Sequence, residues 1–464
     1  MERISAQLRS IHTSSSNPYQ ILLSTYLLEQ LDIKEGQNIW LRLGSERIQV
    51  RCKHLFTIDE GSHIHLPSAL GRSHCFPIKA GHYTFTYFPH LQELRLGIII
   101  GLLTEKTPDH IQMFGNISDF SRELYLLCLE HQMTLYLFSL DDIEEDRIHG
   151  YTLDETGITK STFPLPDVIY NRISSRSIER SEKYSQFFER CKDLGIAFFN
   201  DHFLSKWETL RILIELDTVA AYLPETHLYE GIESLVLIDK HPIVFLKPIH
   251  GREGKGIIRV QKTNTEQVQL DFSSKRNTMK STVLQKTAIR FFEDLLPKET
   301  HIVQQGIPLL EYEGGKIDFR ILCNRNDKGK WYISSSIARL SAQDRFVSNL
   351  SQGAKVYPSI EILERFFDKK KTHQLIQTMF EIAIDVSECI SLHAGGIFGE
   401  LGIDIGVDTK GHPWIIEINT KPSKQYLVES RTSGIRPSAR GVFQFARFLA
   451  ETSFHSSESL SSIN

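Results

Sequence analysis

Two apolar stretches, ELGIDI at 400–405 and WIIEIN at 414–419, decide the fold of the C-terminal half of this 464-residue chain. The short turn between them predicts a β-hairpin that places Asp404 near Glu417. Glu417 and Asn419 are two residues apart, so on a strand both point to the same face. Isoleucines flank these polar side chains, which is unlike a solvated strand face, the alternative. Because carboxylate and amide oxygens suit Mg²⁺ shared with phosphates, the hairpin predicts a magnesium site.

A glycine-bearing turn lies upstream, within 244–260. A strand that ends near Lys247 runs into the turn at 251–256 and then into a second strand. Glycines let the backbone approach a polyphosphate, and the lysine supplies positive charge. The turn is not a Walker A loop, because GxxxxGK[ST] is absent and the chain returns into a strand. The pattern predicts a phosphate clamp, with a plain β-hairpin as the alternative.

A third group of polar residues lies between these two motifs. Asp318 and Arg320 share one apolar strand, Arg339 lies on the next, and Asn349 follows in the stretch 347–354. Arginine and asparagine side chains can stabilise the negative charge of a transferring phosphoryl group. Asp318 and Arg320 point to the same strand face, so a structural ion pair between them is the alternative.

Composition restricts the classes of partner. The chain has 53 basic and 57 acidic residues and a formal net charge of -4, so no overall field draws it to nucleic acid. The six cysteines are far apart, without a CxxC pair, which favours a reduced, intracellular protein over a zinc ribbon or redox motif. The N-terminus resembles no signal peptide, and the longest apolar stretch, 96–103, is too short to cross a membrane. We expect neither nucleic acid nor membrane as a partner.

The first part of the chain predicts two small domains. Residues 1–92 contain short alternating segments and a faint repeat, in which 21–36 echoes 64–81. Two half-barrels, similar to those of double-psi or cradle-loop barrels, explain this repeat, and an unrelated β-meander is the alternative. Residues 93–200 alternate strand, helix and strand, which indicates a small Rossmann-like α/β domain, although a GxGxxG fingerprint is absent.

The motifs, taken in this order from Lys206 onward, resemble the ATP-grasp superfamily over about residues 200–424. The resemblance implies an α/β and α+β multidomain protein, with an ATP-grasp domain at 201–454. The serine-rich composition of the residues that follow predicts a flexible tail at 455–464. The resemblance also implies the cofactors ATP and Mg²⁺, and a ligase that phosphorylates a carboxylate and lets an amine displace the phosphate. A kinase with a hydroxyl acceptor and a nucleotide-binding structural protein are the alternatives.

The resemblance gives each matched residue an expected role. Lys247, Arg339 and Asn349 would be catalytic, and Asp404, Glu417 and Asn419 would hold magnesium. The substrate would meet Arg172, Asp318, Arg320 and Arg345, although for Arg172 a surface ion pair is the alternative. The nucleotide would meet two lysines, the glycine loop and a hinge, namely Lys206, Lys247, Gly251, Gly254, Lys255, Gly256, Gln304, Gln305, Gly306 and Ile307.

The fuller pattern, with 168–172 and the β-rich module in front, is similar to the YheC/YheD family of ATP-grasp proteins associated with the endospore coat. This implies a cytoplasmic or mother-cell location, or association with the coat. The implied partners are a small-molecule or peptide substrate with a carboxylate, and spore coat proteins. The run from Arg339 to Gly353 is also similar to ribosomal-protein glutamate ligases. Where many of those ligases have a second arginine, this chain has Val347, which puts the acceptor chemistry in doubt.

Overall fold

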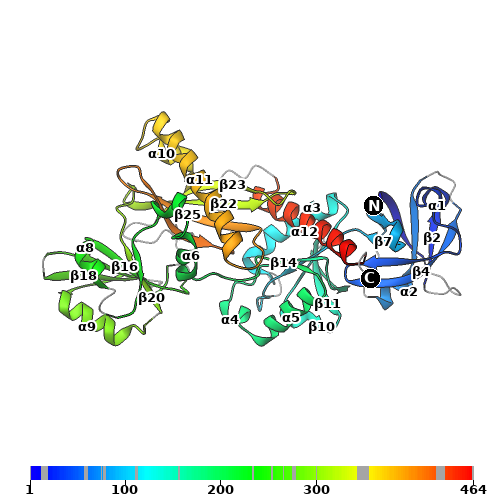
Figure 1. Cartoon of the computed structure of the whole chain (residues 1–464), viewed down its shortest axis with the longest axis horizontal. Helices are drawn as coiled ribbons and strands as arrows, with labels where there is room; N and C mark the ends of the chain where they lie inside the picture. Colours follow the sequence, from blue (N-terminus) through cyan, green and yellow to red (C-terminus); the bar gives the residue numbers. More distant parts are fainter. Residues whose placement is uncertain are drawn as a thin grey trace. The chain divides into compact units, whose positions relative to one another are not determined.

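The computed structural model describes residues 2–11, 19–56, 61–74, 76, 80–109, 113–154, 157–231, 235–251, 254–264, 266–273, 278–298, 300–341, 355–424 and 434–461. The chain divides into two compact units. Unit 1 contains residues 1–201, 326–329 and 435–464, and unit 2 contains 202–325 and 330–434. Figure 1 labels the elements of both units. None of the helices in the described ranges has the length and apolar character needed to cross a membrane.

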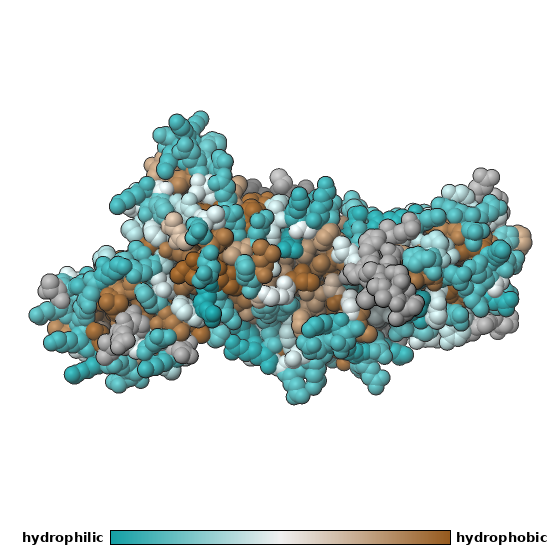
Figure 2. Space-filling model, viewed as in Figure 1, coloured by the Kyte–Doolittle hydropathy of each residue, from teal (hydrophilic) through white to brown (hydrophobic). Residues whose placement is uncertain are grey.

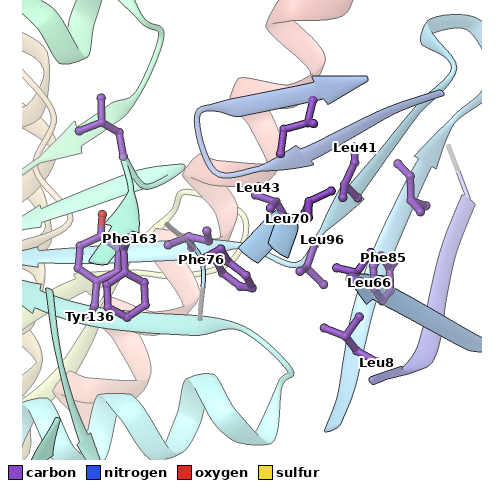
Figure 3. Close-up of a cluster of buried hydrophobic side chains, with 14 of the residues drawn as sticks. Leu8, Leu41, Leu43, Leu66, Leu70, Phe76, Phe85, Leu96, Tyr136 and Phe163 are labelled. Atoms are coloured by element: carbon purple, nitrogen blue, oxygen red, sulfur yellow. The ribbon is translucent and has the colours of Figure 1, made fainter. Parts of the chain in front are cut away.

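Unit 1 begins with a closed barrel in the strand order β1-β5-β2-β4-β3-β7-β6. The parallel pairs β1/β5 and β2/β4 are equivalent in the two halves, and a short helix follows both β2 and β5. This confirms the predicted barrel and explains the sequence repeat. Figure 3 shows apolar side chains such as Leu8, Leu66 and Phe85 in this core. The elements are β1 (Glu2–Ile11), β2 (Gln20–Ser24), α1 (Thr25–Gln30), β3 (Asn38–Leu43), β4 (Glu46–Leu55), β5 (His63–Pro67), α2 (Ser68–Ser73), β6 (Gly81–Phe88), η1 (Pro89–Leu91) and β7 (Glu93–Leu96).

The second layer of unit 1 is a sheet in the order β10-β11-β9-β8-β13-β14, with β12 paired to β11. Its strands β9, β8, β13 and β14 are parallel, as a Rossmann-like domain requires. The elements are β8 (Ile99–Leu103), η2 (Gly115–Ile117), α3 (Ser118–Glu130), β9 (Thr134–Phe138), η3 (Leu140–Asp142), β10 (Ile143–Glu144), β11 (Arg147–Asp154), β12 (Gly157–Pro164), β13 (Val168–Asn171), α4 (Arg176–Glu179), α5 (Glu182–Asp193) and β14 (Ala197–Phe199).

The C-terminal helix α12 (Pro437–Ser461) belongs to unit 1. Its buried face, which includes Phe443 and Phe445, shares a hydrophobic core with Phe120 of α3 and Tyr170 of β13. The expected domain boundary at 454 placed this helix with the ATP-grasp segment instead. The helix also runs beyond 455, the expected start of a flexible tail, since no Gly or Pro interrupts its last turns.

Unit 2 contains two antiparallel sheets. The first has the order β15-β20-β16-β17-β18-β19. Its core contains Val244 and Leu246 of β16, Val260 of β17 and Phe292 of α9. The elements that precede and form it are α6 (Lys206–Leu213), α7 (Asp217–Ala220), β15 (Thr226–Leu228), α8 (Leu237–Lys240), β16 (Ile243–Pro248), β17 (Ile258–Lys262), β18 (Gln267–Ser273), β19 (Thr278–Leu284), α9 (Gln285–Leu295) and β20 (His301–Gln305).

The second sheet of unit 2 has the order β24-β23-β22-β25-β26, with β21 paired to β22. Figure 1 shows the long helix α11 beside this sheet, and Figure 2 shows hydrophilic residues around α10 and the start of α11. Ile403 and Ile405 share a core with Met379 and Val386 of α11. Since side chains alternate along a strand, Asp404 points to the opposite face. The elements are β21 (Glu311–Tyr312), β22 (Gly315–Arg325), β23 (Trp331–Leu340), β24 (Lys355–Pro358), α10 (Ser359–Leu363), α11 (Lys369–His393), β25 (Glu400–Val407) and β26 (Pro413–Asn419).

Candidate functional site

The hairpin of β25 and β26 brings the predicted metal ligands together. Asp404 is the cross-strand partner of Glu417, and Gly402 is the partner of Asn419. The register shifts just after Asp404, so that Ile416 is an extra residue in β26. The Asn419 amide also donates a hydrogen bond of 3.3 Å to Asp404 Oδ2. The three side chains are therefore neighbours on one face, and metal binding by them stays a prediction.

A buried network of alternating charges crosses the same sheet face. Asp318 of β22 accepts hydrogen bonds of 2.8 and 2.5 Å from Arg339 of β23. Arg339 Nη2 also lies 3.0 Å from Asp404 Oδ2, and Arg320 binds both oxygens of Asp404, one of them at 2.9 Å. Asp318 and Arg320 are thus both in ion pairs, but with partners on other strands rather than with each other.

Charge is retained in this network despite burial. Burial disfavours an ionised Asp404, but the guanidinium groups of Arg320 and Arg339 outweigh it and hold the pKa of this carboxyl below its usual value. Burial likewise opposes the charge of Arg339, yet Asp318 and Asp404 raise the pKa of its guanidinium. Asp404 and Arg339 therefore stay charged at neutral pH, which suits a site for a highly charged ligand.

Lys206 connects two parts of the site. It is the first residue of α6, and the capping box formed by Ser205 and Glu208 fixes the start of this helix. Lys206 Nζ donates to Glu417 Oε1 at 2.7 Å and to the Gly251 carbonyl at 2.9 Å. A single lysine thus contacts both the predicted metal ligands and the predicted phosphate clamp. The pattern Ser-x-x-Glu at 205–208 was a sequence signal for this helix start.

The glycine loop connects β16 with β17, as the sequence predicted. Gly254 and Gly256 have φ values of 69° and 72°, a left-handed conformation that favours glycine. The loop is also held at its start, because Lys206 N–H donates to the Ile249 carbonyl at 3.0 Å. Lys255 is half-buried in the same turn. The contacts of Gly251, Gly254, Lys255 and Gly256 with a nucleotide stay predictions.

Lys247, near the end of β16, is the second predicted phosphate lysine. Its ammonium group donates to Oε1 of Gln304 on β20, and the Gln304 amide donates in turn to Thr226 Oγ1 at 2.9 Å. Burial, followed by the positive charge of Lys206, lowers the pKa of Lys247 to about 8. We did not expect Gln304 to contact Lys247 from the sequence, because the two residues are far apart along the chain.

The predicted hinge, Gln304 to Ile307, packs closely against β16. The backbone N–H of Gly306 donates to the Ile243 carbonyl at 2.8 Å, and the backbone N–H of Gln305 donates to the Glu225 carbonyl at the same distance. A Cβ atom on Gly306 would lie 2.5 Å from Cγ2 of Ile243, so only glycine allows this approach. Adenine binding by Gln304, Gln305, Gly306 and Ile307 stays a prediction.

The remaining predicted site residues are Arg172, Arg345 and Asn349. Arg172 follows β13 in unit 1, where its amide donates to the Leu103 carbonyl at 2.7 Å, and its role as a substrate contact stays a prediction. Arg345 and Asn349 lie outside the described residues. A buried ion pair between Glu400 of β25 and Lys424, which follows β26, was not expected from the sequence.

The donor chemistry of the hairpin fits a divalent cation. Mg²⁺ is commonly held by one or two carboxylates, with phosphate oxygens and water completing its coordination. Asp404 and Glu417 provide two carboxylates, and Asn419 provides an amide oxygen. Within the described ranges no three His, Cys, Asp or Glu side chains form a metal site by themselves. A magnesium site here therefore depends on Asn419 and on the ligand.

Comparisons with known proteins found similar sequences and structures. Endospore coat-associated protein YheD of Bacillus subtilis (strain 168) is 27% identical over 379 residues, which cover 80% of this chain and 83% of that protein. Endospore coat-associated protein YheC of the same organism is 24% identical over 319 residues, covering 67% and 86%. The solved structure of D-alanyl-alanine synthetase A from Vibrio cholerae O1 biovar eltor str. N16961 aligns with a TM-score of 0.44 and 13% identity, covering 77% and 98%.

The family comparison includes every predicted site residue of unit 2. The model of the YheC/D like ATP-grasp family matches residues 195–449, which is more than half of the chain. This range begins before Lys206 and extends beyond Asn419, and so contains the glycine loop, the charge network and the hairpin. The chain therefore belongs to the YheC/D-like ATP-grasp family.

Proposed function

We propose that this protein is an ATP-dependent carboxylate-amine ligase that acts through an acyl phosphate. The observation that carries the proposal is the position of Lys206, which binds both the Gly251 carbonyl and the Glu417 carboxylate. A ligand with phosphates beside the glycine loop and a metal beside Glu417 would meet this lysine from both sides. The likeness to YheC and YheD supports a modified substrate in the spore coat.

The side chains of the site have separate roles in phosphoryl transfer. Lys206, Lys247 and the glycine loop would orient the phosphates, and Asp404, Glu417 and Asn419 would hold the cation, which when bound neutralises charge on the phosphate oxygens. Arg339 keeps its charge because Asp318 and Asp404 surround it. It would offset negative charge as the γ-phosphoryl group leaves ADP and bonds to the substrate carboxylate oxygen.

The second step needs no protein nucleophile. The amine attacks the carbonyl carbon of the acyl phosphate, the bond from this carbon to the phosphate oxygen breaks, and phosphate leaves with the bonding electrons. The amine loses a proton to solvent. The described cysteines are buried, and burial raises the pKa of the thiols of Cys52 and Cys323 to about 12, which opposes thiolate chemistry.

The test uses the full-length protein with ATP, Mg²⁺ and an extract of spores or sporulating cells. We expect ADP release, a product heavier than its substrate by an amino-acid residue in mass spectrometry, and a hydroxamate when hydroxylamine is added. A phosphorylated product that gives no hydroxamate would identify a kinase instead. Nucleotide binding without ADP release, across extracts and added amino acids, would support a structural role and contradict the ligase.

A further inference from the structure

Both predicted metal-binding carboxylates are already paired with side-chain cations from other elements. Lys206 Nζ lies 2.7 Å from Glu417 Oε1, and Arg320 binds both oxygens of Asp404. A metal ion that enters this site must therefore compete with two cations of the protein itself.

We propose that Lys206 and Arg320 are exchangeable cations, which neutralise Glu417 and Asp404 until Mg²⁺ replaces them and then turn to the phosphates of ATP. This inference rests on the proposed function, since it concerns the same nucleotide site. It adds that binding of the metal and binding of the nucleotide are coupled. The metal takes the carboxylates from Lys206 and Arg320, and the phosphates of the nucleotide then pair with these two cations.

The contacts distinguish the movable cations from the fixed one. Arg339 binds Asp318 through two nitrogens as well as Asp404, so it keeps a carboxylate when Asp404 changes its partner. Arg320 has hydrogen bonds to Asp404, and 16% of its side chain is exposed, against 7% for Arg339. Lys206 has 17% exposure, and its carboxylate partner Glu417 has 31%. Lys206 and Arg320 are therefore the two cations with room to move.

The exchange avoids an unpaired buried charge at each stage. Without ligands, the carboxylates of Asp404 and Glu417 are neutralised by protein cations, and Asn419 adds a hydrogen bond to Asp404. With both ligands, the metal would neutralise the carboxylates, and the released cations would neutralise phosphates. With metal alone, Lys206 and Arg320 would lose their carboxylate partners, and Lys206 would keep only its hydrogen bond to the Gly251 carbonyl among the contacts described above, which makes that state unfavourable. Metal and nucleotide should therefore each strengthen binding of the other by the same factor.

The test measures each ligand separately on wild type and Lys206→Met. Electron paramagnetic resonance gives the affinity for Mn²⁺ without nucleotide, and calorimetry gives the affinity for a non-hydrolysable ATP analogue in EDTA. We expect Mn²⁺ to bind about 3-fold more tightly to the variant, because a competing cation is absent. The analogue should bind about 10-fold more weakly, because a charged hydrogen-bond donor to phosphate is lost.

A second variant and a matched control complete the design. Arg320→Met, like Lys206→Met, should bind Mn²⁺ more tightly and the ATP analogue more weakly. Circular dichroism checks that the variant is folded. Lys355→Met removes a comparable lysine from the exposed Lys355–Glu313 pair of unit 2 and should change neither affinity. Unchanged, undetectable or weakened Mn²⁺ binding in folded Lys206→Met would overturn the exchange. Wild type that binds neither Mn²⁺ nor the analogue, separately or together, would overturn the proposed function itself.

Discussion

Asp318 and Arg339 face each other across β22 and β23, and two hydrogen bonds of 2.8 and 2.5 Å join them. Both side chains are less than a tenth exposed. A buried guanidinium requires such a partner, because an unpaired charge in the interior is costly. Asp318 therefore holds the Arg339 guanidinium in place within the buried network. The role of Asp318 as a substrate contact stays a prediction.

Asp318→Asn should destabilise unit 2 by about 3 kcal/mol, because it removes one charge from a buried ion pair. The midpoint of urea unfolding, followed by tryptophan fluorescence, measures this effect, since Trp207, Trp331 and Trp414 all lie in unit 2. Glu313→Gln, in an exposed pair with Lys355, is the control and should cost less than about 1 kcal/mol. Equal shifts in the two variants would contradict the importance of the buried pair.

ATP affinity should fall as the pH rises through about 8, the pKa to which burial and Lys206 lower Lys247. Protonated Lys247 binds phosphate, and the neutral amine above this pH does not. Calorimetry between pH 7 and 9.5 should show a decrease of roughly tenfold, the effect of one charged hydrogen bond. Lys247→Arg stays charged and should give a flat profile. The same slope in Lys247→Met would show that another group titrates.

Glu417→Gln should keep the fold and lose ATP turnover. The amide has the size of the carboxylate and can remain beside Asp404, but it cannot provide the charge that holds a divalent cation. We expect ADP release in the presence of substrate extract to fall at least about 100-fold, because metal stabilisation of a transferring phosphoryl group amounts to several kcal/mol. Normal turnover in Glu417→Gln would exclude Glu417 as a metal ligand.

Gly306→Ala should destabilise the hinge, because the new Cβ would lie 2.5 Å from Ile243 Cγ2 and 2.8 Å from the Ile243 carbonyl oxygen. Overpacking of this kind costs about 1–3 kcal/mol, which urea unfolding measures. Gly81→Ala in β6 is the control, since its nearest new contact would be at 3.8 Å and its effect should be within about 0.5 kcal/mol. A stable Gly306→Ala protein with unchanged ATP affinity would argue against a rigid hinge.

The parts of the fold that depend on nearby residues could be predicted from sequence. The hairpin around Asp404 and Glu417 follows from two apolar strands and one turn, and the barrel follows from two similar half-units. The cross-strand partner of Arg320 could not be predicted in the same way. Residues opposite each other on neighbouring strands are about 5 Å apart, closer than residues i and i+2 on one strand, so Arg320 pairs with Asp404.

Long-range contacts explain the other differences. Lys247 contacts Gln304 because β16 and β20 are adjacent in the sheet. The local sequence of neither strand predicts this order of strands. The elements that pack against α12 could not be predicted from the sequence either, since an amphipathic helix shows which face is apolar but not which sheet covers that face. Arg345 and Asn349 lie outside the described residues, and the roles that the resemblance implies for them stay predictions.

The return of the chain to unit 1 through α12 has a consequence for how the protein can be divided. The barrel and the parallel sheet of unit 1 precede unit 2 in the sequence, whereas the helix that covers Phe120 and Tyr170 follows it. A stop codon after residue 434 would leave the sequence of unit 2 complete, but it would remove α12 and expose the apolar surface of unit 1 that this helix covers. The protein therefore cannot be shortened directly after unit 2 without harming unit 1.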